Sequence, residues 1–205
     1  MSLVFYYAPM STAVVSHWIL EELGIPYEKV KLDISKGETK QPDFVKLNPN
    51  GAVPTIVHDG APVFESAAIT IYLGETFGAD KGLFPAPGPQ RGQALSWIVW
   101  ANATLGGAIN RHQLAASERI PAEQRNAKAA EVARAELERL FGVLDGALAG
   151  KQWLVGDGFS LVDAHVAAFV AYAGFVGFDT KPWASLDAWR TRATSRPAYA
   201  TAMQP

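Results

Sequence analysis

Strand-like and helix-like hydrophobic patterns alternate along residues 3–77. Residues 3–7 form a compact apolar and aromatic run, which is typical of a buried strand, and Pro9 ends it. The helical pattern that follows carries apolar residues on one face, namely Val15, Trp18, Ile19 and Leu23. Residues 27–32 then alternate with the period of a half-exposed strand, and a short helix has room after Pro42.

A hairpin and a second helix complete this region. Residues 54–57 and 62–64 are short apolar runs on either side of Asp59-Gly60, a strong hairpin signal. A helical pattern follows over residues 66–77. The order β-α-β, short helix, β-β-α predicts a parallel strand pair extended by a hairpin, with helices packed on the sheet.

The composition changes at residues 78–90, which are rich in glycine and proline and resemble a linker. No convincing strand pattern follows. An amphipathic helix is predicted from Pro121 onward, with its apolar stripe at Leu137, Leu140, Phe141, Leu144 and Leu148. We therefore predict an α/β domain over residues 1–78, a linker over 79–89 and an all-α domain over 90–205.

Composition excludes several classes of function. A chain of 205 residues with 49% hydrophobic and 19% charged residues is typical of a globular protein, and a net charge of −2 argues against nucleic-acid binding. Without cysteine, any thiol chemistry must use a thiol that a ligand brings. The histidines lack metal-ligand spacing, so we expect no metal site. The chain has no basic signal-peptide region, and its apolar run at 166–178 is too short to span a membrane, which favours a cytoplasmic protein without membrane contact.

The stretch "NPNGAVPTIVHDGAPVFESAAITIYL", residues 48–73, resembles the glutathione-binding half of cytosolic glutathione transferases. The stretch "GDGFSLVDAHVAAF" resembles the capping-box helix of the same family, in which Ser160 and Asp163 are a structural cap. The resemblance covers nearly the whole chain. It implies a thioredoxin-like domain followed by an all-helical domain, in a homodimeric cytoplasmic enzyme of detoxification that uses glutathione and no metal.

The resemblance also implies how glutathione binds. A cis peptide between Val53 and Pro54 would leave the Val53 backbone free to pair with the extended tripeptide, although an ordinary edge-strand proline is the alternative. Glu65 and Ser66 begin a helix, where Ser66 suits the γ-glutamyl carboxylate and Glu65 suits its ammonium group. Plain capping of that helix is the alternative for Ser66.

The glycyl end of glutathione is predicted near Lys40. Plant-type (phi-like) transferases have His-Lys where this chain has Thr39 and Lys40, and they have Gln where Ala52 stands. Two polar contacts are then missing, so we expect glutathione to bind more weakly than in those relatives, by about tenfold or more. A solvated surface lysine is the alternative reading of Lys40.

The stretch "PMSTA", residues 9–13, resembles the serine-type site of phi, theta and delta transferases, with Ser11 in the catalytic place. Beta-type bacterial relatives put a cysteine where Thr12 stands. A hydroxyl that donates a hydrogen bond to the glutathione sulfur favours the thiolate. Ser11 is therefore the first candidate and Thr12 the second; either could instead only cap the first helix.

The electrophile of this family lies against the first helices of the helical domain. The candidates there are Trp97, Trp100, Arg111 and His112, although a tryptophan stripe is also typical of a core or a dimer interface. The sequence thus predicts conjugation of glutathione to a small apolar electrophile. The alternatives are a non-catalytic binding or stress protein on the same scaffold and a glutathione-dependent isomerase or dehalogenase.

Overall fold

The computed structural model describes residues 2–9, 11–118 and 120–204, which form two compact units. The first unit contains the chain up to Arg91 together with the segment from Ser195 onward, and the second unit contains Gly92–Thr194. This division places the last residues with the α/β unit, whereas the sequence analysis assigned them to the helical domain.

The first unit contains a four-stranded mixed sheet in the order β2-β1-β3-β4. Its strands are β1 (Leu3–Tyr7), β2 (Glu28–Lys31), β3 (Thr55–His58) and β4 (Ala61–Phe64). β1 and β2 are parallel, while β3 is antiparallel to both β1 and β4. Asp59 and Gly60 both have positive φ in the turn between β3 and β4, as their sequence signal predicts. The predicted thioredoxin-like order is confirmed.

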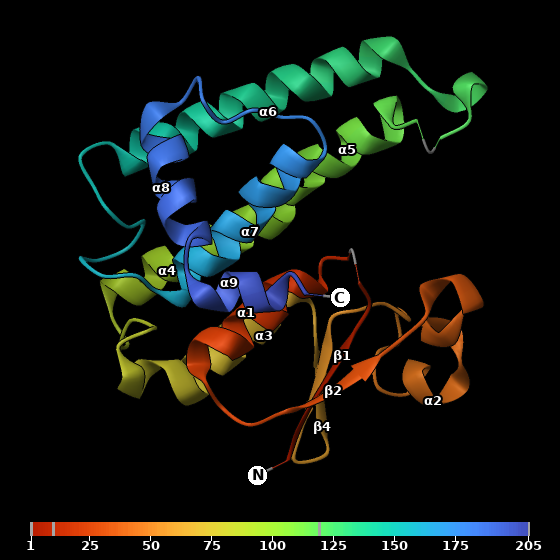
Figure 1. Ribbon diagram of the computed structural model, residues 1–205, viewed down its shortest axis with the longest axis vertical. Coiled ribbons are helices and arrows are strands. Elements are labelled where there is room, and N and C mark those ends of the chain that lie inside the picture. Colours follow the sequence, from red (N-terminus) through yellow and green to blue (C-terminus); the bar gives the residue numbers. More distant parts are fainter. Residues whose placement is uncertain (1, 10, 119, 205) are drawn as a thin grey trace. The chain divides into compact units, whose positions relative to one another are not determined.

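Helices cover both faces of this sheet because successive side chains of a strand point to opposite sides. Phe5 of β1 packs against His17 of α1 (Ala13–Leu23), whereas the next residue, Tyr6, packs against Phe44 of α2 (Pro42–Val45). Figure 1 shows α1 beside α3 (Ser66–Leu73), with α2 on the other side of the strands. The shorter turns of this unit are Ile34–Lys36, Glu38–Lys40, Gly74–Gly78 and Ala79–Lys81.

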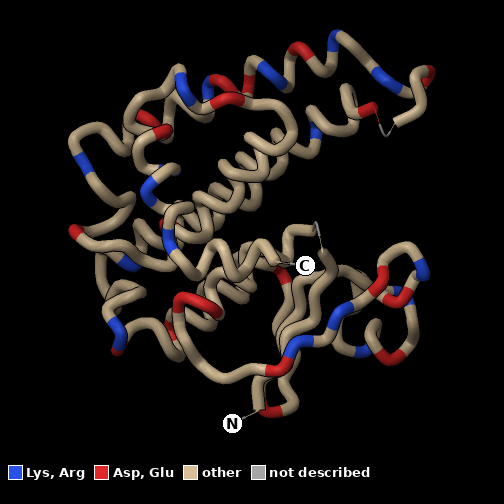
Figure 2. Tube along the Cα trace, viewed as in Figure 1, with Lys and Arg blue, Asp and Glu red and all other residues tan. Residues whose placement is uncertain are grey.

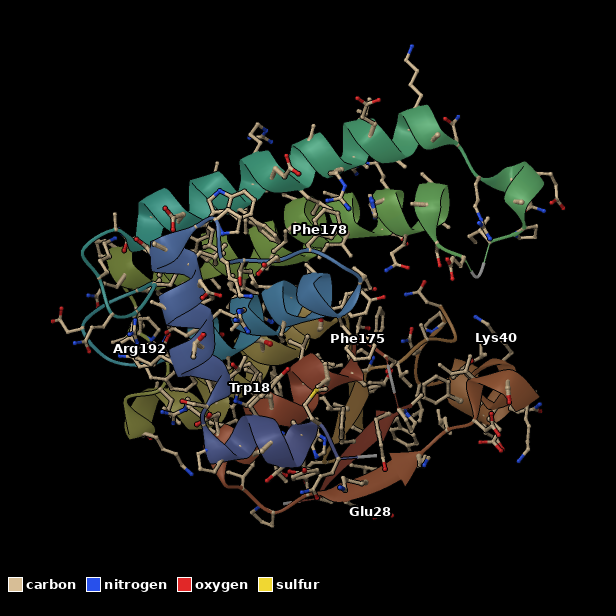
Figure 3. The ribbon with its side chains drawn as sticks, turned by 45° about the horizontal axis from the view of Figure 1, so that its top comes forward. Trp18, Glu28, Lys40, Phe175, Phe178 and Arg192 are labelled. Atoms are coloured by element: carbon tan, nitrogen blue, oxygen red, sulfur yellow. The ribbon has the colours of Figure 1, made fainter. Side chains whose placement is uncertain are left out.

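The C-terminal helix α9 (Pro197–Ala202) packs on α1. The ring of Tyr199 lies 4.6 Å from that of Trp18, which is fully buried and is labelled in Figure 3. The Arg196 guanidinium donates two hydrogen bonds of 2.6 Å to the Glu22 carboxylate, the geometry of a strong bidentate pair. These contacts join residues from opposite ends of the chain, which local sequence patterns do not report.

The described residues of the second unit form helices and connecting loops and contain no strand, as the sequence predicts. Its elements are α4 (Pro89–Trp100, which begins in the first unit), a π-helical turn (Ala101–Leu105), α5 (Gly106–Ala116), a 3-10 turn (Ala122–Gln124), α6 (Ala127–Leu148), α7 (Leu161–Phe175) and α8 (Ala184–Thr194). The five residues of the predicted apolar stripe on α6 are buried, and Figure 2 shows charged residues of both signs along the same helix. α6 begins after Asn126, whose Oδ1 caps Ala129 N at 3.0 Å, and not at Pro121.

A capping box begins α7. The Asp163 carboxylate, which is fully buried, accepts hydrogen bonds from Ser160 N at 2.9 Å and from Ser160 Oγ at 3.0 Å. It also accepts from Leu154 N at 2.8 Å and from Trp189 Nε1 of α8 at 2.9 Å. One side chain therefore joins the start of α7, the preceding loop and α8. No helix in the described part of the chain is long and apolar enough to cross a membrane.

Candidate active site

The strand pairing of the first unit brings three predicted segments to one edge of the sheet. Tyr6 at the end of β1 pairs with Thr55 at the start of β3, so the turn after β1 lies beside Val53 and Pro54. Thr55 also pairs with Phe64 at the end of β4. Glu65 therefore follows on the side of β3 opposite to β1. The segments that contain Ser11-Thr12, Val53-Pro54 and Glu65-Ser66, which the sequence predicts to form the site, therefore lie close together.

The Ser11 hydroxyl is engaged within its own turn. It donates a hydrogen bond to the Ala8 carbonyl at 2.7 Å and accepts one from Ala13 N at 3.2 Å. A serine hydroxyl has one proton to donate, and in this arrangement that proton is directed at the Ala8 carbonyl. Ser11 thus acts as a cap for the turn that leads into α1.

Thr12 is exposed and is the residue immediately before α1. Its side chain makes no capping hydrogen bond. Its Oγ1 lies 3.5 Å from the Val53 carbonyl oxygen, at the outer limit of a hydrogen bond. The Thr12 proton is therefore loosely held and lies beside the backbone edge that Val53 provides. Of the two hydroxyls, that of Thr12 is better placed to donate to a ligand atom at this edge.

The peptide between Val53 and Pro54 is cis, as the resemblance implies. Lys40 stabilises the loop that leads to it, because its Nζ donates to the carbonyls of Asn50 at 2.9 Å and Gly51 at 2.8 Å. Figure 3 shows Lys40 beside α2. A Cβ on Gly51, at φ 55°, would lie 2.7 Å from the carbonyl oxygen of Thr39, which is buried. Thr39 and Lys40 therefore contact this loop.

Glu65 precedes the first turn of α3 with φ 71° and ψ 121°. A positive φ at a residue other than glycine costs free energy and is concentrated at functional sites. Glu65 is exposed and Ser66 is buried. The arrangement places an anionic side chain next to the N–H groups and the positive dipole end of a helix, so that one charged ligand carrying both an ammonium and a carboxylate group would find partners for both.

The candidates for electrophile contact lie in the second unit. Trp97 and Trp100 are half-buried and meet edge to face, with ring centroids 5.2 Å apart. Arg111 Nη2 donates to Glu136 Oε2 of α6 at 2.8 Å. The His112 ring lies 4.7 Å from that of Phe178, which Figure 3 labels.

His112 and Phe178 belong to a cluster between α5 and α6. The Arg134 guanidinium of α6 lies 4.6 Å above the Phe178 ring. Burial, and then the charge of Arg134, lowers the pKa of His112. Arg111 and His112 are thus engaged in contacts between α5, α6 and the segment after α7. Among the described residues, no group of three His, Asp or Glu side chains could hold a metal ion.

Two residues of this region were not singled out from the sequence. Asn48 and Thr55 are buried and hydrogen-bond within the loop that carries Val53. The available signal was the Asn48-Pro49 dipeptide, which favours a turn. The direction of the two side chains could not be inferred from it.

Comparison with known proteins identifies the family of the chain. Residues 1–75 match the family model described as glutathione S-transferase, N-terminal domain, and residues 108–197 match that of the C-terminal domain. The chain is 35% identical over 181 residues to glutathione S-transferase GstB of Escherichia coli K12, which covers 87% of this chain and 86% of the relative. It is 31% identical over 209 residues to the disulfide-bond oxidoreductase YfcG of the same bacterium, covering 97% and 93% of the two chains.

Solved structures show the same fold over the full length. A glutathione transferase homolog from Lodderomyces elongisporus, described as having two GSH per subunit, superposes with a TM-score of 0.90 at 25% identity, covering 99% of this chain and 98% of the other. The glutathione transferase URE2P5 from Phanerochaete chrysosporium gives a TM-score of 0.87 at 28% identity, covering 98% and 93%. From the paired family domains and the relatives of similar length, the chain belongs to the glutathione S-transferase family.

Proposed function

We propose that the protein conjugates glutathione to a small apolar electrophile. The observation that carries this proposal is the meeting of Thr12, the Val53 backbone and the Glu65-Ser66 helix start at one edge of the sheet, in a chain of the glutathione S-transferase family. Extended peptides commonly bind by pairing with backbone N–H and C=O groups such as those of Val53, which lies just outside the ladder of β3. In this arrangement the glutathione sulfur lies near Thr12, its γ-glutamyl group near Glu65 and its glycyl end near Lys40.

We propose that the Thr12 hydroxyl donates a hydrogen bond to the glutathione sulfur and thereby stabilises the thiolate. An ordinary thiol has a pKa near 8.5, so only a few per cent is ionised at neutral pH. A donated O–H hydrogen bond and the N-terminus of α1 both favour the ionised sulfur. The sulfur then forms a bond to the electrophilic carbon, the leaving group departs with its electron pair, and the thiol proton goes to solvent. Ser11, the first candidate from the sequence, supports the turn in this proposal.

Replacing Thr12 by valine separates the two hydroxyls. We expect Thr12→Val to raise the pKa of bound glutathione by about one unit and to lower kcat/KM with a chlorinated nitroarene about tenfold at neutral pH. Ser11→Ala is the matched control, and we expect it to lower the free energy of unfolding by about 1 kcal/mol while the thiol pKa stays the same. The thiolate absorbance of the complex, titrated with pH, measures the pKa. If the pKa of the bound glutathione thiol rose in Ser11→Ala and not in Thr12→Val, the catalytic hydroxyl would be that of Ser11. The protein would then be of the serine type.

Glu65 is proposed to bind the γ-glutamyl ammonium group. Replacing it by glutamine keeps the size of the side chain and removes its charge, so we expect the Kd for glutathione to rise about tenfold to thirtyfold, the value of one charge-assisted hydrogen bond. Calorimetric titration measures this change. Glu75→Gln is the control, because Glu75 is an exposed carboxylate of the same unit that pairs with Arg91. Equal Kd values for the two variants would place the ammonium group elsewhere.

Reduction of disulfides is a second candidate activity. It is favoured by the 31% identity to a disulfide-bond oxidoreductase over nearly the whole chain. A bound glutathione thiolate would attack the disulfide, form a mixed disulfide and release one thiolate. A second glutathione would then attack the mixed disulfide, giving glutathione disulfide and the second thiol. Glutathione supplies both electrons, so the protein needs no sulfur of its own.

Parallel assays distinguish the two activities. Turnover of a dialkyl disulfide, coupled to glutathione reductase, supports the second, whereas conjugation of a chlorinated nitroarene supports the first. Trp97 and Trp100 remain the proposed contacts for an apolar electrophile, because Arg111 and His112 already contact Glu136 and Phe178. A homodimer and a cytoplasmic role in detoxification are proposed from the family alone.

A further inference from the structure

A buried amide organises the loop from Asn48 to Thr55. The Asn48 side chain is only 3% exposed. Its Nδ2 donates to the Ala52 carbonyl at 2.7 Å and to Thr55 Oγ1 at 3.1 Å, and its Oδ1 accepts from Asn50 N at 3.0 Å. Both the nitrogen and the oxygen of the Asn48 amide therefore form hydrogen bonds within this loop.

Thr55 completes a closed set of hydrogen bonds. Its Oγ1 accepts from Asn48 and donates its own proton to the Ala52 carbonyl at 3.2 Å, so two donors converge on one carbonyl oxygen. Thr55 is fully buried, and its backbone lies in β3 between β1 and β4. The Ala52 carbonyl is thus fixed relative to the sheet and not only relative to its own loop.

The direction of this carbonyl determines the direction of the next N–H group. A trans peptide is planar, and its C=O and N–H point in opposite directions. The Ala52–Val53 peptide is not among the cis peptides of the described chain. Because the Ala52 carbonyl points inward to Asn48 and Thr55, the Val53 N–H points the opposite way.

We propose that Asn48 and Thr55 are positioning residues that direct the Val53 N–H at the backbone of bound glutathione. This inference rests on the proposed function, in which Val53 pairs with the tripeptide. A donor that is already oriented loses little conformational freedom on binding, so binding is tighter than to a loop that samples several directions. Lys40 donates to the carbonyls of Asn50 and Gly51, whereas the hydrogen bonds to the Ala52 carbonyl come from Asn48 and Thr55.

Thr55→Val tests the proposal with a nearly isosteric change that removes the O–H donor. We expect the Kd for glutathione, measured by calorimetry, to rise about fivefold to tenfold, as for the loss of one hydrogen bond. We expect kcat at saturating glutathione to stay within about twofold, since Thr55 touches no reacting atom. Thr55→Ser restores the hydroxyl and is expected to restore the Kd.

Asn48→Asp is the second variant. It keeps the acceptor for Asn50 N and replaces the donor that faces Ala52 and Thr55 by an oxygen. We expect its Kd for glutathione to rise at least as much as in Thr55→Val. The control is Thr180→Val, which removes another buried threonine hydroxyl, the donor to Asp187 Oδ1 in the second unit. Its expected effect is a lower Tm with an unchanged Kd.

The outcomes separate positioning from stability. A lower Tm together with an unchanged Kd in both Thr55→Val and Asn48→Asp would overturn the positioning role and leave the proposed function intact. Failure of the wild-type protein to bind glutathione would overturn the proposed function, and this inference with it. A raised Kd that serine restores at position 55 supports the role that we assign to the pair.

Discussion

Replacing Asp163 by alanine is expected to lower the free energy of unfolding of the second unit by about 4 kcal/mol or more, because each buried donor left without a partner costs about 1–3 kcal/mol. The donors concerned are Leu154 N, Ser160 N and Trp189 Nε1. Burial raises the pKa of Asp163, while these hydrogen bonds lower it. Denaturant unfolding of the full chain, followed by tryptophan fluorescence, measures the change.

Asp145→Ala is the matched control for this prediction. Asp145 also joins two helices of the second unit, but its carboxylate accepts a single hydrogen bond among the residues that the structure describes, from Leu186 N to Oδ1 at 2.9 Å. We expect its replacement to lower the free energy of unfolding by about 1 kcal/mol. If the two variants lost the same stability, Asp163 would be no more than a helix cap, for which a loss of about 0.5–2 kcal/mol is typical.

The stability of the second unit is also expected to fall as the pH drops below 6.5, the ordinary pKa of histidine, because burial lowers the pKa of His165 to about 3. His165 is fully buried, with its Nε2 2.7 Å from Asn102 Oδ1. Between these two pKa values the unfolded chain binds a proton that the folded chain does not. The free energy of unfolding therefore falls by about 1.4 kcal/mol per pH unit from this residue. The contribution is fully present above pH 6.5 and is lost progressively toward pH 3.

His165→Gln isolates this contribution from that of other groups, since Asp163 has a raised pKa and acts in the opposite direction. We expect the slope of unfolding free energy against pH, measured from neutral pH to about pH 4.5, to be smaller in the variant. The difference corresponds to the uptake of nearly one proton, or about 1.4 kcal/mol per pH unit. His112→Gln is the control. Its imidazole is only half-buried, so its removal is expected to change the slope less. Identical slopes in wild type and His165→Gln would mean that the folded protein protonates His165.

Local patterns were sufficient for the architecture of the first unit. The apolar run at Leu3–Tyr7, the helical face that contains Trp18 and the turn at Asp59-Gly60 each depend on neighbours within a few residues, and each is found as predicted. The order of these elements then leaves few ways to pair the strands. The helical second unit follows similarly from the buried stripe of α6.

The candidate site could be located from the sequence, but the roles within it could not. The motifs at Ser11-Thr12, Val53-Pro54 and Glu65-Ser66 lie in separate segments, and β-strand pairing brings them to one edge. Whether Ser11 or Thr12 can donate a hydrogen bond to a ligand depends on the direction of each hydroxyl proton. The Ser11 proton is directed at a carbonyl of its own turn, whereas Thr12 faces Val53, which is 41 positions away in the sequence.

The sequence by itself determined the order of elements from periodicity, and its short motifs indicated the family and the segments that are proposed to form the site. The tertiary structure decided the roles of single polar groups. It gave Asp163 partners in the preceding loop and in α8, packed the last helix on α1, and turned the Ala52 carbonyl toward Asn48 and Thr55. The physical reason is that a hydrogen bond depends on distance and direction, and for these groups both are set by how the segments pack.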